Sequence, residues 1–126
     1  MYLYDLDRRH ADRYAVPNAK IKYRLSSGHG DVTPLKDMAQ NSASFQINHA
    51  VQPGEAIELE ILIPAKDKIS LKATCVRISS QQNSNLSFAA VQFLPYSTIE
   101  RYNSFRSQEQ LHELVEEFRK TLPVVP

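Results

Sequence analysis

Short runs of alternating apolar and polar residues fill the chain between residues 16 and 94, and turn residues separate these runs. Alternation with a period of two is typical of a β-strand that buries one of its faces. The pattern predicts about six strands without intervening helices, which favours an antiparallel barrel or sandwich. The predicted strands are residues 19–25, 32–38, 43–47, 56–63, 69–78 and 86–94.

The segments between these runs contain residues that favour turns. Residues 26–31 are rich in Ser and Gly. The sequence Gln-Pro-Gly-Glu at 52–55 places Pro at the first corner of a turn and Gly at the second. The polar run 79–85 predicts a hairpin loop between the last two strands.

After Pro95 the apolar period changes from that of a strand to that of a helix. Residues 97–100 have the sequence of a capping box, which predicts that a helix starts at Ser97. The polar patch 106–110 leaves open whether this zone forms one helix or two, and Pro123 ends it in either case. The apolar stripe of the predicted helix consists of Ile99, Tyr102, Leu111, Leu114, Val115, Phe118 and Leu122.

Length and charge limit the class of protein. The 126 residues are 42% hydrophobic and 23% charged, which is typical of one globular domain with a real core. Lys and Arg total 15 against 14 for Asp and Glu, so the formal net charge is +1. This balance argues against binding to DNA, RNA or an anionic membrane through charge alone.

No targeting or membrane segment is expected from the sequence. No run approaches the roughly 18 consecutive apolar residues of a membrane span. The first residues of the chain are too charged for the apolar region of a signal peptide. We therefore expect a cytoplasmic protein that does not insert into a membrane.

The sequence contains no pattern that requires an enzyme. Its single cysteine, Cys75, excludes an intramolecular disulfide and is predicted to be a small core side chain, because it lies in an apolar strand. Neither a G-x-S-x-G nor an H-E-x-x-H motif is present. The histidines lack metal-ligand spacing, so we expect no catalytic residue, no metal site and no cofactor; they are His10, His29, His49 and His112.

A small barrel can also bind single-stranded nucleic acid, which needs a basic groove and exposed aromatic rings. The aromatic residues of the predicted strands stand singly among apolar neighbours, where packing in the core is the expected role. A nucleic-acid binder is therefore only a remote alternative. The residues concerned are Tyr23, Phe45, Phe88 and Phe93.

The first 14 residues differ from the rest of the chain. They show no sustained period, and we predict a flexible arm over residues 1–14 followed by a single domain over 15–126. Arg8, Arg9 and Arg13 lie within six residues of one another, next to three aspartates. The arginines either pair with these aspartates as a solvated leader or capture an anion, since guanidinium groups bind phosphate bidentately and stack on bases.

The arm and the barrel pattern together resemble the PilZ family. Residues 9–13 (RHADR) are similar to the R-x-x-x-R element that opens these domains, and residues 37–42 (DMAQNS) to the D/N-x-S-x-x-G element. The turn at 52–55 and residues 90–93 (AVQF) resemble the Pro-Gly turn and the G-V-x-F segment of the family. The resemblance implies a six-stranded antiparallel PilZ-type β-barrel with a C-terminal α-helix or two short helices.

The resemblance also implies a bacterial, non-catalytic receptor for cyclic di-GMP, the second messenger of motility and biofilm formation. By this similarity Arg9 and Arg13 would stack on the guanine bases and contact phosphate, with Arg8 assisting. Asp37 would accept hydrogen bonds from a guanine edge. The remaining positions of the second element that we expect to contact the ligand are Ala39, Asn41 and Ser42.

Two residues depart from the family pattern. Ala39 replaces a serine, so a hydrogen bond of about 0.5–1.5 kcal/mol is lost. Ser42 replaces a glycine, which costs about 1–3 kcal/mol if the position needs a positive φ or a close approach of the backbone. The alternative function is therefore a degenerate PilZ module that binds a protein without nucleotide. The protein partner is unidentified, and monomer and homodimer both remain open.

Overall fold

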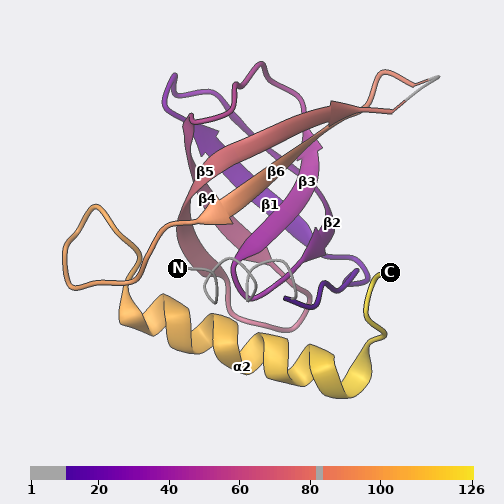
Figure 1. Cartoon of the computed structure of the whole chain (residues 1–126), viewed down its shortest axis with the longest axis vertical. Helices are drawn as coiled ribbons and strands as arrows, with labels where there is room; N and C mark the ends of the chain where they lie inside the picture. Colours follow the sequence, from indigo (N-terminus) through magenta and orange to yellow (C-terminus); the bar gives the residue numbers. More distant parts are fainter. Residues whose placement is uncertain (1–10, 82–83) are drawn as a thin grey trace.

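The computed structural model describes residues 11–81 and 84–126. Its strands are β1 (Lys20–Leu25), β2 (Gly30–Met38), β3 (Ser42–Ile47), β4 (Ala56–Leu62), β5 (Ile69–Ser80) and β6 (Ser87–Phe93). They are antiparallel and close into a barrel in the order β1-β2-β3-β6-β5-β4 (Figure 1). The pairing of β1 with β4 closes the barrel and sets Lys22 opposite Glu60. The predicted six-stranded antiparallel barrel is confirmed.

The alternation that predicted the strands also predicts which side chains fill the barrel. In β4, Ile57, Leu59 and Ile61 are at most 2% exposed, whereas Glu58 between them is exposed. Burial of apolar surface stabilises such a core by about 25 cal/mol per Å². The observed strand bounds differ from the predicted ones by at most two residues, as at β2, which begins at Gly30.

The aromatic side chains of the strands lie mainly inside the barrel. Tyr23, Phe45 and Phe93 are buried, and the rings of Tyr23 and Phe45 lie 5.7 Å apart between centroids. Phe88 is half-buried, with the amine of Lys36 5.2 Å from its ring centroid. The three buried rings therefore offer no surface on which a nucleic-acid base can stack.

The turn predicted at 52–55 is present, and it uses its glycine as expected. Gly54 has a φ of +92°, a value that side chains other than glycine rarely adopt. The amide of Glu55 donates to the carbonyl of Gln52 at 3.1 Å, which closes the turn. A second glycine, Gly30, is required by space, because a Cβ there would lie 2.3 Å from the carbonyl oxygen of Tyr23.

The C-terminal zone forms one α-helix within the described residues, α2 (Phe105–Thr121), which lies across one end of the barrel (Figure 1). Ser104 caps its first turn by accepting from the amide of Ser107 at 3.1 Å, and the helix ends just before Pro123, as predicted. The apolar stripe is buried at Leu111, Leu114, Val115 and Phe118. No helix of the described residues is long and apolar enough to cross a membrane.

The helix start predicted at Ser97 is wrong, and so is the predicted burial of Ile99, which is 52% exposed. Residues 97–103 form a loop because Asn103 binds the sheet. The Asn103 side chain accepts from the amide of Lys72 at 2.6 Å and donates to the carbonyls of Lys72 and Leu94 at 3.0 and 2.9 Å. These bonds continue the β5 edge where β6 ends, and a helical path from Ser97 would break them.

Cys75 lies in the core as predicted, and it is 1% exposed. Burial raises the pKa of its thiol, so the reactive thiolate is scarce in the folded protein. We expect the native protein to react with a disulfide reagent at about pH 8 far more slowly than the unfolded protein does. Thiol release followed with and without denaturant measures this difference, and equal rates would contradict the burial of Cys75.

Candidate functional site

The last residues of the predicted arm lie beside the end of β2. Tyr14 and Met38 form an isolated antiparallel bridge, in which the Tyr14 amide donates to the Met38 carbonyl at 2.8 Å and the Met38 amide donates back at 3.0 Å. The Tyr14 side chain is fully buried. Two backbone bonds and a buried ring thus fix the chain one residue after Arg13.

This anchoring brings Arg13 to Asp37. An Nη atom of Arg13 donates to an Oδ atom of Asp37 at 3.4 Å, across 24 positions of sequence. The Arg13 side chain is 47% exposed and that of Asp37 only 6%. A fixed, nearly buried acceptor therefore lies under a cation that can still reach a ligand in solvent.

The segment 39–42 makes the corner between β2 and β3. The amide of Ala39 donates to the carbonyl of Ser42 at 2.8 Å, and the amide of Phe93 donates to the carbonyl of Asn41 at 3.0 Å. Ala39 is fully buried, whereas Asn41 and Ser42 are partly exposed. Of the second predicted element, the surface of this corner therefore consists of Asn41 and Ser42 rather than Ala39.

The C-terminal end of the chain also contacts the arm. The amide of Val125 donates to the carbonyl of Arg13 at 2.8 Å. The ring of Tyr14 lies 5.9 Å from that of Phe118 on α2, measured between centroids. The position of Arg13 is thus coupled to both the helix and the residues that follow it.

The structure brings together the predicted residues that it describes: Arg13, Asp37, Ala39, Asn41 and Ser42 lie at one end of the barrel. Arg8 and Arg9 lie outside the described residues. The sequence interpretation did not single out Tyr14 or Val125. Tyr14 could have been singled out, because a large aromatic residue directly after Arg13 is a candidate for burial. Val125 contributes only its backbone amide, and such a contact leaves no sequence pattern.

The site offers hydrogen-bond donors and acceptors rather than a reactive group. Among the described residues, its ion pair consists of one guanidinium and one carboxylate, and its corner adds an amide side chain and a hydroxyl. Over residues 11–81 and 84–126, no three His, Cys, Asp or Glu side chains are grouped so as to hold a metal ion. The arrangement suits recognition of a ligand that presents both an anion and hydrogen-bond donors.

Comparison with known families identifies the family of this chain. The family model of the PilZ domain matches residues 7–116, a range that includes both predicted elements. The chain belongs to the PilZ family. None of the curated proteins compared with this PilZ domain matches it in sequence.

Solved structures share the fold of this PilZ domain. The PilZ domain of YcgR from Escherichia coli with c-di-GMP has a TM-score of 0.69 at 16% identity, covering 90% of this chain and 92% of that one. The K. pneumonia MrkH–c-di-GMP complex has a TM-score of 0.70 at 10% identity, covering 90% of this chain and 52% of that one. The inhibitor of motility MotI/DgrA of Bacillus subtilis has a TM-score of 0.66 at 14% identity, covering 90% and 53%. The chain thus spans about half of the MrkH and MotI/DgrA chains.

The serine at position 42, where the family has glycine, does not strain the backbone of this PilZ domain. Ser42 is not among the residues with positive φ in the described chain, so its side chain adds no backbone strain. It begins β3 opposite Gln92 of β6, in the extended conformation that any residue adopts. The cost expected for a strained serine therefore does not arise, and only the space that its side chain takes from a ligand remains.

Proposed function

We propose that this PilZ domain is a non-catalytic receptor for cyclic di-GMP that binds at the corner between β2 and β3. The observation that carries the proposal is the 3.4 Å contact between Arg13 and Asp37, which joins the two family elements in one site. Cyclic di-GMP presents two phosphates and two guanine edges. The solved structures of YcgR and MrkH with c-di-GMP support this ligand for a chain of the same fold.

In the proposed complex each charged group takes the part of the ligand that matches its chemistry. The Arg13 guanidinium donates to a phosphate and stacks on a base, as its planar fork allows. Asp37 accepts from the ring N–H and amino group of a guanine, because a carboxylate offers acceptors only. Asp37 exchanges its contact with Arg13 for the guanine donors, so the nearly buried carboxylate keeps hydrogen-bond partners in the proposed complex.

Arg8 and Arg9 are proposed to complete the phosphate and base contacts from the arm. Ordering of the arm on the ligand would alter a surface that a protein partner reads, which is a common type of switch. The pathway we propose is the control of motility or biofilm formation in a bacterial cytoplasm. The partner is a protein whose identity the sequence does not give.

The second candidate function is a PilZ module that binds a protein without nucleotide. The complete burial of Ala39 and the serine at position 42 favour it, because both positions lack the family's ligand-facing residue. This alternative keeps the barrel and α2 but assigns no ligand to Arg13.

Calorimetric titration with cyclic di-GMP separates the two functions. The receptor proposal predicts saturable heat and an increase in melting temperature at ligand concentrations on the order of 100 μM. GTP at the same concentration is the control, because it carries guanine and phosphates but lacks the cyclic dinucleotide. Absence of both heat and stabilisation would leave the protein-interaction module as the function.

The substitution Ser42→Gly is expected to have opposite effects on affinity and stability. It removes the side chain that takes space from a ligand at this corner, and it should tighten cyclic di-GMP binding about tenfold, equivalent to 1.4 kcal/mol. Ser42→Gly should lower the free energy of unfolding by about 0.5–1 kcal/mol, because glycine weakens a strand. Titration and denaturant unfolding of the variant measure the two effects. An unchanged affinity would show that the ligand does not approach this corner.

A further inference from the structure

The segment that follows α2 returns to the predicted arm at Arg13. The helix ends at Thr121, and Leu122 after it has a φ of −124° and a ψ of 147°, so the chain becomes extended there. Figure 1 shows this segment in yellow, running back toward the indigo start of the described chain. The amide of Val125 donates to the carbonyl of Arg13 at 2.8 Å. We call residues 122–126 the return segment.

The carbonyl that Val125 binds belongs to the same peptide unit as the amide of Tyr14. A peptide unit is planar, and its N–H and C=O groups point in opposite directions. The Tyr14 amide donates to the carbonyl of Met38 at 2.8 Å, so one rigid plane is bonded to β2 on one side and to the return segment on the other. Two opposed bonds fix the orientation of this plane more tightly than the bond to Met38 does alone.

The orientation of this peptide unit sets the direction in which the Arg13 side chain leaves the backbone. The guanidinium lies 3.4 Å from Asp37, which is longer than the roughly 2.7–2.9 Å of a strong charge-assisted hydrogen bond. A contact of this length holds the guanidinium loosely, and the Arg13 side chain is 47% exposed. Its placement therefore depends on the backbone that carries it.

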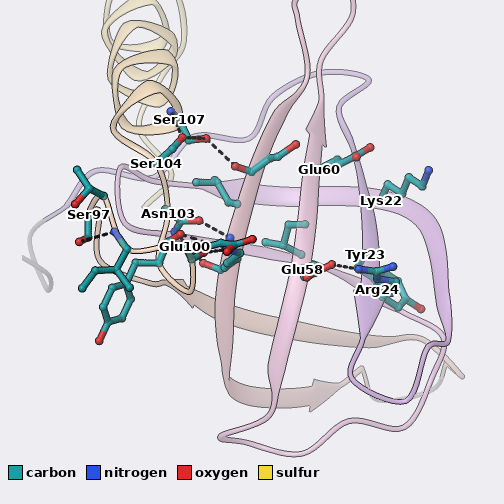
Figure 2. A pocket seen from close by; sticks show the side chains of 17 residues that line it. Lys22, Tyr23, Arg24, Glu58, Glu60, Ser97, Glu100, Asn103, Ser104 and Ser107 are labelled. Carbon is teal, nitrogen blue, oxygen red and sulfur yellow. Dashed lines mark hydrogen bonds and ion pairs between the residues drawn. The ribbon is translucent and has the colours of Figure 1, made fainter.

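The two ends of α2 are attached to the barrel differently. At its start, Asn103 accepts from the amide of Lys72 at 2.6 Å, and the Ser107 hydroxyl donates to the backbone of β5 at 2.9 Å (Figure 2). At its end, the polar contacts with the rest of the described chain are the exposed ion pair of Glu117 with Lys66 and the bond of the return segment. Exposed ion pairs contribute little to stability. The bond to the arm is thus a main polar attachment of this end.

The return segment itself buries little surface. Leu122 and Val125 are partly buried, whereas Pro123 and Val124 between them are exposed. Segments with few buried contacts open locally at a low cost in free energy. A small change at Arg13 can therefore change how often the return segment is docked.

We propose that the Val125 amide positions Arg13 for cyclic di-GMP, and that the ligand in turn holds the return segment against the arm. The proposal rests on the proposed receptor function and adds a positioning residue to it. Linkage requires the two effects to be equal: a docked segment raises the affinity by the same factor by which the ligand favours docking. The end of α2 would then be a surface whose order depends on the ligand.

Val125→Pro removes the donor, because proline has no backbone N–H. Calorimetric titration should show cyclic di-GMP binding about two- to tenfold more weakly, the range expected for one hydrogen bond. Val125→Ala keeps the amide and should bind within about twofold of the unsubstituted protein. Val124→Pro is the matched control, because the Val124 amide has no hydrogen-bond partner in the described chain. Denaturant unfolding shows that each variant is folded.

Hydrogen exchange of the unsubstituted protein gives a readout that a merely structural role of Val125 would not move. Saturation with cyclic di-GMP should slow exchange of the Val125 amide by the factor that Val125→Pro loses in affinity. The Gly28 amide is the control, since it donates to the carbonyl of Leu25 in the turn between β1 and β2, away from the proposed site. Its exchange should be unchanged by the ligand.

Failure of this proposal and failure of the receptor function give different results. If the unsubstituted protein binds cyclic di-GMP and Val125→Pro binds it equally tightly, the positioning role is overturned and the receptor function stands. Equal losses in Val125→Pro and Val124→Pro, or unchanged exchange at Val125 on saturation, would overturn it in the same way. If the unsubstituted protein does not bind the ligand at all, the receptor function fails and this proposal falls with it.

Discussion

Arg13→Ala is expected to weaken cyclic di-GMP binding at least about 100-fold, the loss of two charge-assisted hydrogen bonds of about 1.5 kcal/mol each. The guanidinium is half-exposed and is held beside Asp37 by the bridge between Tyr14 and Met38. Removing it takes away the described cation of the site. The fold should survive with a free energy of unfolding lower by about 1–3 kcal/mol, because Asp37 loses its partner.

Calorimetry of the variant measures the affinity, and denaturant unfolding shows that it remains folded. Arg119→Ala is the control, since Arg119 is also an exposed arginine paired with a carboxylate, that of Glu116 on α2. The control should bind as tightly as the unsubstituted protein. An Arg13→Ala variant with undiminished affinity would contradict the proposed role of this residue.

Asn103→Ala is expected to lower the free energy of unfolding by about 2–4 kcal/mol, because it leaves buried backbone groups without a hydrogen-bond partner. The side chain binds the amide of Lys72 and the carbonyl of Leu94, and nothing else in the described chain replaces it there. The loop 97–104 would then lose its main attachment to β5. Denaturant unfolding followed by circular dichroism measures the change.

Asn85→Ala is the matched control, because Asn85 is exposed in the loop between β5 and β6. It should change the free energy of unfolding by less than about 0.5 kcal/mol, the usual range for surface positions. Similar losses in the two variants would mean that the bonds of Asn103 contribute little to stability.

The strands could be predicted from the sequence because their determinants are local. Alternation such as that of Ile57, Leu59 and Ile61 states directly which face is buried. The turn at 52–55 likewise carries its own signal in Gly54, whose φ is positive. Errors at the strand ends are small, because the alternation fades where neighbouring strands stop pairing.

The start of α2 could not be predicted in the same way. The capping pattern at Ser97 is a local signal of the same kind as that at Ser104, where the helix does begin. What distinguishes them is the attachment of Asn103 to Lys72, 31 positions away in sequence. Such a long-range contact leaves no trace in the residues around Ser97.

The candidate site also depends on a contact between residues that are distant in the sequence. The sequence contains Arg13 and Asp37, and the family resemblance assigns them to one ligand, but their contact depends on the buried ring of Tyr14. The cross-strand neighbours of the charged residues on β1 and β4 were not predicted either. Lys22 and Glu60 become neighbours only because β1 pairs with β4 to close the barrel.

The most direct test of the receptor function is an amide chemical-shift titration of the protein with cyclic di-GMP. The ligand is predicted to shift saturably the amides of Arg13 and of residues 37–42, and to leave those of Glu58 and Glu60 in β4 unchanged. This single measurement reports both binding and its position. Absence of saturable shifts at Arg13 and residues 37–42 would contradict the proposal that this PilZ domain is a cyclic di-GMP receptor.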